Sequence, residues 1–476
     1  MTTQNINNSR GFRYVRYVGP NNVRCNIAEL AFYGYPGEGD DSHLAQTTNI
    51  PDVIIHTTDC QDILDRENYI KGIVSFISGD GATFYTDSVE IRGRGNYSWT
   101  SFDKKPYRIK LAEKTNVLGF PAEARNWTLI SNHSDKTLMR NLLAFDLSKR
   151  MEMPYTPAGR PVNLYLNGEY KGCYQLCDHI DVRKKRVDVK EMKITDISGE
   201  NLTGGYLIEA DAYAKSEPKY FTSNRNTNVT IKSPDSEEIT TQQFNYIRNH
   251  FNLLESTLYA STYTNPTTGF RKHLDTKTFI RHFLVGELSG NTDTYWSTYF
   301  YKQRNDDKFY VGPVWDFDIA FENDNRTYPI NNYPDFIFRK GSVVGDMRNF
   351  VNRLLSDTQL YNELKQTYAD YRDWGYLTEK ELMQTIDDYA AEMETSQQLN
   401  FTRWDVLNKR IHQNNQPAGS YTGEVNVVKN YLKNRLIWMD NKLNYVPNPN
   451  NKPTFLESAK QSSIAVWTES NRIHVE

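Results

Sequence analysis

The part of the sequence that decides the fold is residues 291–318, which read N-T-D-T-Y-W-S-T-Y-F-Y-K-Q-R-N-D-D-K-F-Y-V-G-P-V-W-D-F-D. Its middle predicts two strands, at 297–302 and 309–314, because both runs are rich in aromatic and β-branched residues and flank the turn-forming R-N-D-D at 304–307. A helical pattern at 276–289 comes directly before it. We therefore expect a helix, a loop, a β-hairpin and a second loop, with acidic residues in both loops.

The second loop carries two carboxylates, Asp316 and Asp318, just beyond a strand. A carboxylate at a strand end is costly to bury unless it is paired or bound to a cation. In an extended chain the two would point to opposite faces, so only a bend lets both face one ion. Mg²⁺ held by one or two carboxylates and substrate phosphates fits this pattern. The alternative is that one Asp caps the next helix and the other pairs with an arginine.

The first loop carries Asn291 and Asp293 at the end of the predicted helix. Asp316 follows Asp293 by 23 residues, and the intervening chain is filled by the predicted hairpin. This order is that of a kinase catalytic loop, a β-hairpin and a metal-binding Asp. Asn and Asp at the end of a helix more commonly form only a C-terminal cap and turn. The kinase-like order of the elements is therefore what favours a catalytic role for this pair.

A second group of candidates lies upstream, in the motif Arg92-Gly93-Arg94-Gly95, which follows a strand-like run. A single G-x-G is a weak signal for phosphate binding. The two arginines add to it, because a guanidinium can hold two phosphate oxygens at once.

The next basic segment is K-K-P-Y-R-I-K-L at 104–111. Strand alternation puts Arg108 and Lys110 on one face, and Ile109 and Leu111 on the other. A strand lysine that faces a nucleotide is a part of kinases. A solvated basic face is the alternative for any one of these lysines.

The remaining pattern predicts an α+β architecture in two lobes, with a β-rich front, a mixed middle and a helical back. Asn167-Gly168 between two alternating runs predicts a hairpin. The other expected strands are at 53–57, 72–77, 88–92 and 204–211. The other expected helices are at 136–151, 237–262, 347–355, 359–374, 379–400 and 427–443.

Composition narrows the class of protein and its partners. The chain has 476 residues, a net charge of -3, 24% charged and 38% hydrophobic residues, which is ordinary for a globular protein. No broad basic field is implied, so we do not expect a nucleic-acid partner. No apolar run is long enough to span a membrane. The abundance of Tyr, Asn and Thr favours an extracytoplasmic protein, and no signal peptide is visible at the start of this sequence.

The four cysteines, Cys25, Cys60, Cys173 and Cys177, allow three disulfide pairings. The cysteines could be buried free thiols, or two of them could form a single disulfide; the sequence leaves both alternatives open. A zinc site is not favoured, because no further His or Cys pair stands at zinc-ligand spacing.

The sequence resembles the CotH family in six motifs that occur in the family's order: R-G-R-G-N-Y-S-W, K-K-P-Y-R-I-K-L, N-W-T-L-I-S-N-H-S-D-K-T-L-M-R-N, P-V-N-L-Y-L-N-G-E-Y-K-G-C-Y-Q-L, G-G-Y-L-I-E-A-D and G-P-V-W-D-F-D-I-A-F. The match covers roughly residues 51–440. The resemblance implies an atypical two-lobed protein-kinase-like fold with a β-rich N-lobe and a helical C-lobe. It also implies ATP and Mg²⁺ or Mn²⁺ as cofactors, and phosphate transfer to Ser or Thr of a protein.

The resemblance implies a role for particular residues. Asp293 would be the catalytic base and Asp316 would hold Mg²⁺, with Asp318 as a second metal candidate and Asn291 assisting. Arg92, Arg94 and the backbone of Gly93 and Gly95 would lie over the nucleotide, and Lys105 or Lys110 would contact its phosphates. Gln175 and Cys177, in the segment 175–178, would lie beside adenine. Glu322 departs from the family pattern, because a small Gly is expected after W-D-F-D-I-A-F.

Two other functions compete with that of a secreted or surface Ser/Thr kinase. A kinase-like scaffold with weak or no catalysis could serve as a surface binding or adhesion protein. A carbohydrate-active enzyme could use Asp293 and Asp316 as its acid/base pair.

The ends of the chain are expected to belong to other modules. Residues 10–34 are similar to the last strands of discoidin-like carbohydrate-binding modules, so a carbohydrate or surface partner is expected through the flanking modules, on a monomeric protein. The sequence is thus expected to comprise discoidin-like strands or a docked hairpin (1–38), a linker (39–50), the kinase-like domain (51–446), and a Pro/Asn-rich linker with the start of a small β-module (447–476).

Overall fold

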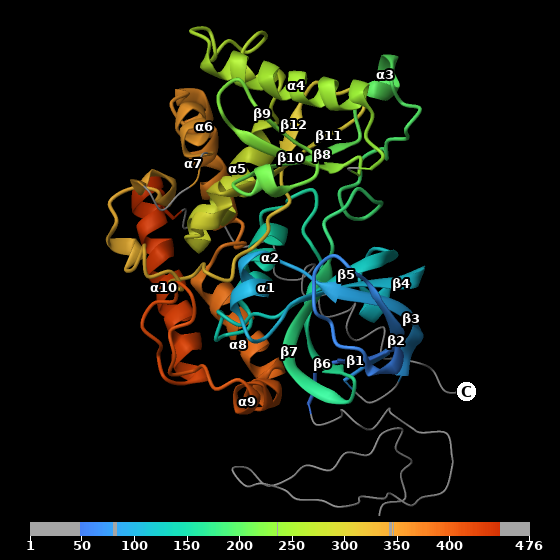
Figure 1. The fold of residues 1–476 in the computed structure, drawn as a ribbon. Coiled ribbons are helices and arrows are strands. Elements are labelled where there is room, and N and C mark those ends of the chain that lie inside the picture. The colour runs from blue at the N-terminus through green and yellow to red at the C-terminus, as the bar shows by residue number, and fades with distance from the viewer. Residues whose placement is uncertain (1–47, 80–82, 236, 342–344, 346, 448–476) are drawn as a thin grey trace, which may run out of the picture.

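The computed structural model describes residues 48–447, except 80–82, 236, 342–344 and 346. Figure 1 shows three parts in this region: a β-barrel drawn mostly in blue, a five-stranded sheet covered by a long helix, and a group of C-terminal helices in orange and red. The mixed α+β class predicted from the sequence is therefore confirmed.

The first part is a closed seven-stranded barrel with strand order β1-β2-β3-β4-β5-β7-β6. Its strands are β1 Asp52–Thr57, β2 Ile70–Ile77, β3 Thr83–Gly93, β4 Tyr107–Thr115, β5 Ala124–Ile130, β6 Gly159–Leu166 and β7 Glu169–Asp178. All neighbours are antiparallel except β1 and β6, which pair in parallel and close the barrel. Side chains along each strand alternate between the inside and the outside of the barrel. On β4, Ile109 and Leu111 are fully buried inside, whereas the alternating residues Arg108 and Lys110 face outward.

The second part is an antiparallel five-stranded sheet with order β12-β11-β8-β10-β9. Its strands are β8 Tyr206–Asp211, β9 Tyr220–Thr222, β10 Asn228–Ser233, β11 Ser297–Lys302 and β12 Phe309–Val311. Ile208 and Ala210 of the central strand belong to the large core that includes the helices. Leu207 and Glu209 occupy the opposite face, and Leu207 packs there with Tyr299 and with the chain that leaves the barrel.

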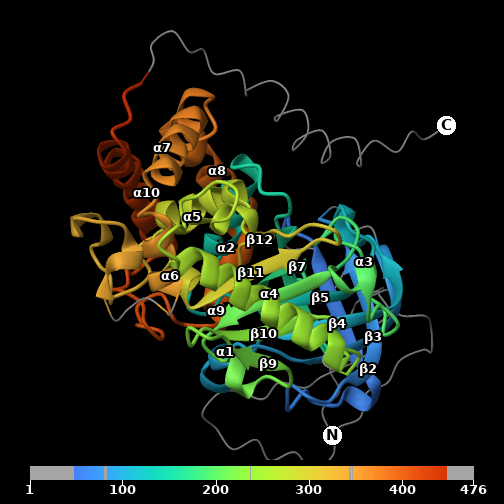
Figure 2. The same cartoon turned by 90° about the horizontal axis from the view of Figure 1, so that it is seen from above.

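The described residues include ten α-helices. They are α1 Tyr97–Ser101, α2 Arg140–Arg150, α3 Gly199–Leu202, α4 Thr241–Tyr259, α5 Thr276–Ser289, α6 Met347–Leu354, α7 Thr358–Asp373, α8 Glu379–Glu392, α9 Glu394–Arg403 and α10 Tyr421–Leu443. Figure 2, viewed from above, shows α4 lying along the five-stranded sheet, while α7, α8 and α10 gather on the other side of α5. None of the helices in the described part of the chain is long and apolar enough to cross a membrane.

Several predicted elements are confirmed at the residue level. The helix 276–289 has the predicted bounds, because Asp275 caps its first turn by accepting from the Thr278 N–H at 2.8 Å and Gly290 ends it. The Asn167-Gly168 hairpin is also present, with both turn residues at positive φ, as a two-residue hairpin turn requires.

Other boundaries were wrong, for local reasons. The strand expected to reach residue 314 ends at Val311, since Pro313 has no N–H to offer a ladder. The helix expected from 136 begins at Arg140, because Asp135 holds the preceding loop by accepting from the Thr137 and Arg140 N–H groups at 2.9 and 2.8 Å.

The single helix expected at 379–400 is also wrong, because it divides at the fully buried Met393 into α8 and α9. The turn redirects α9 toward β7, where Asn400 accepts from the Cys173 N–H at 3.1 Å. The expected strands near the N-terminus, Cys25, and the segment 448–476 lie outside the described residues. Cys60, Cys173 and Cys177 are free thiols.

Candidate functional site

The candidate site is built from the two loops predicted to carry acidic residues. The first contains Asn291 and Asp293 and follows α5, which ends where Gly290 adopts a left-handed φ of 65°. The second follows β12 and contains Asp316 and Asp318. The Asn291 side chain joins the loops: its Nδ2 donates to the Asp316 carbonyl oxygen at 2.9 Å, and its Oδ1 accepts from the Asp293 N–H at 3.3 Å.

The second loop bends at Asp316, whose φ of 63° is rare for a residue other than glycine. Burial, and then the neighbouring charge of Asp318, raise the pKa of Asp316 to about 7. Burial also raises the pKa of Asp293 well above its usual range, and the carboxylates of Asp316 and Asp318 add to this effect. The bonds of Asn291 hold the backbone of Asp293 next to that of Asp316, and Asp318 lies two residues further along the second loop; these three carboxylates are the cluster referred to below.

The three acids differ in their exposure to solvent. The Asp316 side chain is exposed to solvent, whereas Asp293 and Asp318 are half-buried. Protein atoms nevertheless surround Asp316 closely enough to raise its pKa through burial. A ligand can therefore reach Asp316 from solvent while protein encloses it on most sides.

A buried loop from the first half of the chain supports Asp318. The Ser134 hydroxyl donates a short hydrogen bond to the Asp318 carboxylate. Asn323 Nδ2 donates to the carbonyl oxygens of Asp318 and Ser134 at 2.6 and 3.1 Å, and Asn414 Nδ2 also donates to Ser134 at 2.9 Å. Three separate segments thus fix the backbone around one acid.

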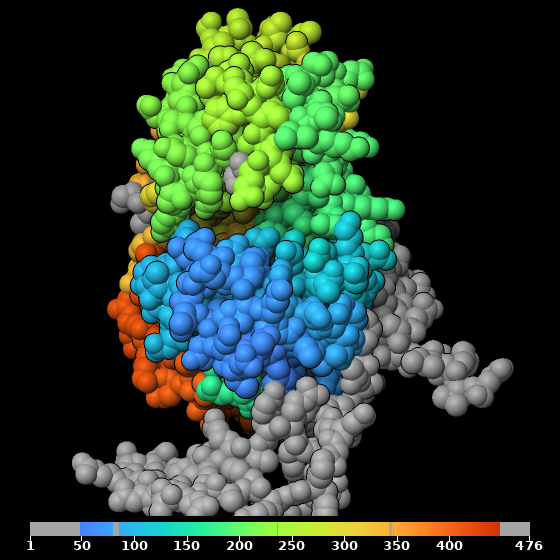
Figure 3. All heavy atoms as spheres, turned by 45° about the vertical axis from the view of Figure 1, so that its right-hand side comes forward, coloured from blue at the N-terminus to red at the C-terminus, as the bar shows by residue number. Residues whose placement is uncertain are grey.

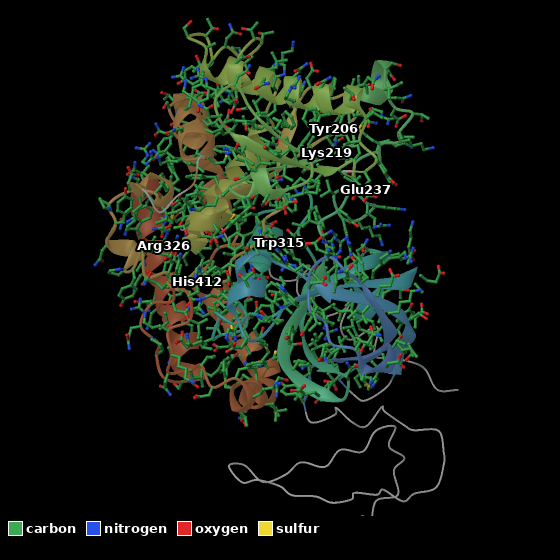
Figure 4. The ribbon with its side chains drawn as sticks, viewed as in Figure 1. Tyr206, Lys219, Glu237, Trp315, Arg326 and His412 are labelled. Carbon is green, nitrogen blue, oxygen red and sulfur yellow. The ribbon has the colours of Figure 1, made fainter. Side chains whose placement is uncertain are left out.

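Arg326 occupies one flank of the cluster. It pairs with Asp324 at 2.7 Å, and its positive charge partly offsets the burial that raises the pKa of Asp293. Figure 4 places Arg326 and His412 toward the C-terminal helices, and Trp315 toward the barrel and the sheet. The acids therefore have two distinct flanks.

Arg94, which directly follows β3, lies on the flank that contains Trp315. The Arg94 guanidinium is 5.8 Å from the Trp315 ring centroid, and its charge opposes the burial that raises the pKa of Asp316. Arg92 and Arg108 stand opposite each other on β3 and β4. Within the described residues none of these three forms an ion pair with a carboxylate, and the buried Nε atoms of Arg92 and Arg108 have no hydrogen-bond partner.

These features fit a metal–phosphate ligand. Mutually repelling carboxylates favour a bound cation, and unpaired arginines favour a bound anion. The described part of the chain contains no group of three or more His, Cys, Asp or Glu side chains arranged to hold a metal ion alone. Mg²⁺ is usually held by one or two carboxylates together with substrate phosphates, so such a group is not required.

Comparison with known proteins agrees with this arrangement. Residues 91–439, most of the chain, match the family model described as CotH kinase protein. The chain belongs to the CotH kinase family. No protein with a curated description matches it.

The two lysines expected from the CotH resemblance to contact phosphates have other partners. Lys105 Nζ donates to the Trp99 carbonyl oxygen at 2.7 Å. Lys110 pairs with Glu90 at 3.0 Å on the outer surface of the barrel. Both ammonium groups therefore already have a partner, and another residue could contact the nucleotide phosphates in their place.

The residues expected beside adenine lie on β7, on the outer face of the barrel. Cys177 pairs in register with Thr128, which in turn pairs with Arg108, so a row of side chains leads from Cys177 to the arginines. Gln175 is fully buried, and its amide has no partner among the described residues. Its side chain amide lies next to Gly159 rather than next to the acids.

Local packing explains why both small residues of the CotH R-G-R-G motif are glycines. A Cβ at Gly93 would lie 2.5 Å from the Trp99 ring. Gly95 has a φ of 83°, and a Cβ there would lie 2.3 Å from Ser98 Oγ. Both glycines thus allow α1 to fold against the end of β3, which positions Arg94.

Several contacts around the acids and on the sheet of this CotH-family chain were not predicted from the sequence. Ser134 lies within the motif N-W-T-L-I-S-N-H-S-D-K-T-L-M-R-N, but nothing in that motif points to its bond with Asp318. Arg326 follows the acids by only a few residues, yet nothing in its spacing distinguishes it from a surface arginine. Lys232 and Glu209 lie on different strands, and only the register of the sheet brings them together.

Proposed function

We propose that this CotH-family protein is an ATP- and Mg²⁺-dependent protein Ser/Thr kinase that acts at the cell surface or after secretion. The observation that carries the proposal is the position of the three acids on two joined loops beside Arg94, which pairs with no carboxylate of the described residues. Phosphate transfer depends mainly on positioning and on charge neutralisation, which these groups can supply.

The metal would be held by Asp316, the carboxylate open to solvent, with Asp318 as the second ligand. When bound, Mg²⁺ would neutralise charge on the phosphates. Asn291 would assist from behind, because both ends of its amide already bond to the backbone of the two acidic loops. Ser134 would keep the Asp318 carboxylate in one orientation.

Asp293 would accept the proton of the Ser or Thr hydroxyl. A carboxylate whose pKa is raised is a stronger base near neutral pH. In the described residues no donor bonds to the Asp293 carboxylate, so both of its oxygens are available. Arg92 and Arg94 would hold phosphate oxygens, and Cys177 and Gln175 would lie on the adenine side.

Two substitutions test the proposal. With ATP at about 100 times its Kd, bound nucleotide should add about 2.7 kcal/mol to the free energy of unfolding. Asp316→Asn should remove this gain, measured by thermal unfolding with Mg²⁺. Asp293→Asn should keep nucleotide binding but lose transfer of labelled phosphate from ATP to casein.

Asp405→Asn is a matched control, because Asp405 is 78% exposed and pairs only with Lys409 on the surface. It should behave as wild type in both assays. Transfer retained by Asp293→Asn would remove Asp293 from the role of base. Unfolding of Asp316→Asn without ligand would instead identify a structural carboxylate.

A scaffold without catalysis is the second candidate, and Glu322 favours it. Glu322 stands at a φ of 65° where a small Gly is expected, and its carboxylate accepts from the Ile330 N–H at 2.7 Å. The loop after the acids is therefore fixed by a bulky side chain. No thermal shift at millimolar nucleotide would favour the scaffold.

A further inference from the structure

Two surfaces face each other across a furrow, one on the barrel and one on the five-stranded sheet. Figure 3 shows the blue barrel and the green part of the chain meeting along a furrow. On the sheet side, β8 turns Leu207 and Glu209 toward the barrel, while Ile208 turns toward the helices. The sheet face beside the furrow therefore carries Glu209 next to the apolar cluster of Leu207 and Tyr299.

Lys232 and Glu209 form an ion pair on this face. Lys232 Nζ lies 2.9 Å from Glu209 Oε2, and the two side chains are 26% and 8% exposed. The Ser297 hydroxyl donates to the other carboxylate oxygen of Glu209. Ser297 of β11 thus fixes the Glu209 carboxylate, and this carboxylate in turn positions the Lys232 ammonium of β10. The ammonium remains partly exposed to solvent.

Arg94 and Arg108 lie on the barrel side. No carboxylate of the described chain pairs with either, and the buried Arg108 Nε lacks any partner. Asp181 is the acid whose charge reaches Arg108, but Arg186 already binds Asp181 at 3.1 Å. Cations left uncompensated at close range repel one another, so an anion between them would be stabilising.

Trp315 connects the two sides: it packs against the cluster of Leu207 and Tyr299 on the sheet, and the Arg94 guanidinium lies 5.8 Å from its ring centroid. Burial lowers the pKa of His179 well below its usual range, and the positive charges of Arg108, Arg186, Arg94 and Lys232 lower it further. Arg94 and the sheet face that carries Glu209 and Lys232 therefore meet at Trp315, the residue before Asp316.

We infer that Lys232, Arg94 and Arg108 clamp the triphosphate of a nucleotide between the sheet and the barrel, with Glu209 as the residue that positions Lys232. This inference rests on the proposed function, and it assigns the phosphate-contacting lysine to the sheet rather than to Lys105 or Lys110. A nucleotide held in this way would tie the two β-structures together.

The test measures binding of ATP, ADP, AMP and adenosine, each with Mg²⁺, to the full chain by calorimetry. Lys232→Met and Arg108→Met should each weaken ATP at least about tenfold, since each removes a charge-assisted contact. The loss should shrink from ATP to AMP and vanish for adenosine, which has no phosphate. A merely structural role would weaken all four ligands alike.

Three further variants serve as controls. Lys219→Met removes an exposed lysine next to β9 and should bind ATP as wild type does. Glu209→Gln keeps the lysine but frees it, so its loss of ATP affinity should be smaller than that of Lys232→Met. Glu209→Gln with Lys232→Met removes both charges, which avoids an unpaired buried carboxylate if the single variant unfolds.

The outcomes separate the clamp from the function on which it rests. Wild type that binds ATP together with variants that bind it equally well would overturn the clamp alone. An equal loss for adenosine, or a loss confined to Lys105→Met or Lys110→Met, would also overturn it. Wild type that binds no nucleotide would overturn the proposed function, and the clamp with it.

Discussion

At the scale of single residues, Glu287 shows how one buried carboxylate organises the region below the site. It is fully buried on α5 and accepts hydrogen bonds from the Tyr295 hydroxyl at 2.6 Å and from the N–H groups of Ile337 and Phe338 at 2.7 and 3.1 Å. Arg435 of α10 pairs with it at 3.1 Å. Four groups from three separate segments thus share one acid.

Removal of Arg435 should therefore be costly. Arg435→Met leaves the Glu287 charge buried without its counter-ion, and we expect a loss of about 3–5 kcal/mol in the free energy of unfolding, measured in urea. Lys433→Met is the matched control on the same helix, since its pair with Glu379 is 55% and 51% exposed and should be worth at most about 1 kcal/mol. Similar losses in both variants would contradict this account.

His282 should make stability depend on pH. Burial lowers its pKa from 6.5 to about 4. The unfolded chain therefore binds a proton on His282 below pH 6.5, while the folded protein does so only near pH 4. Stability is complete above pH 6.5 and falls by about 3 kcal/mol as the pH drops to 4.

His282→Leu should flatten this part of the stability curve, measured by urea unfolding at several pH values. The difference in slope between wild type and variant is the readout, because the substitution also changes packing at all pH values. Parallel curves between pH 6.5 and 4 would show that His282 is not the responsible group.

At the scale of elements, the end of α5 positions the first acidic loop. Gly290 has a φ of 65°, and a Cβ there would lie 2.4 Å from Ile330 Cδ1 and 2.6 Å from the Tyr431 hydroxyl. The helix therefore ends against two other segments, and the turn directs Asn291 toward the second loop.

Gly290→Ala should cost clearly more than the roughly 1 kcal/mol of left-handed backbone strain. Gly119→Ala is the matched control, because Gly119 has a similar φ of 75° with nothing within 4 Å of the added Cβ. Thermal unfolding should show the larger loss for Gly290→Ala, together with reduced phosphate transfer. Equal losses of thermal stability in the two variants would mean that Ile330 and Tyr431 can move away from the added Cβ at little cost.

Elements were predictable where local chemistry specifies them. Asp275 and Gly290 mark the ends of α5, and Asn167-Gly168 marks the turn between β6 and β7. The bend at Asp316 was expected as a condition for metal binding. Closure of the barrel was not predicted, because β1 and β6 pair across more than a hundred residues and neither strand carries a signal for its partner. The Lys232–Glu209 pair was missed for the same reason.

At the scale of the whole molecule, Asn400 links the barrel to the C-terminal helices. Lys104 is buried and donates to Asn400 Oδ1 at 2.8 Å, and burial lowers the pKa of Lys104 to about 7. The same oxygen accepts from the Cys173 N–H on β7. One amide thus satisfies a buried ammonium and a strand of the barrel together.

Asn400→Leu should cost about 2–3 kcal/mol in urea unfolding, since it removes the acceptor of a buried charged donor. It should also raise hydrogen exchange in α9, which would lose its polar anchor on β7. Thr402→Ala changes an exposed residue of the same helix and should alter neither quantity by more than about 0.5 kcal/mol. Unchanged exchange in Asn400→Leu would show that apolar contacts alone hold α9.

The closed barrel has a consequence for how the protein is made. All of its strands come from one continuous stretch, Asp52 to Asp178, whereas the central strand β8 must wait for β11 until α4 and α5 have been synthesised. A growing chain folds from its N-terminal end as it leaves the ribosome. The arginine-bearing barrel can therefore be complete before Asp293 or Asp316 exists. A nascent chain cannot assemble the acidic half of the site until the last strands of the second sheet have emerged.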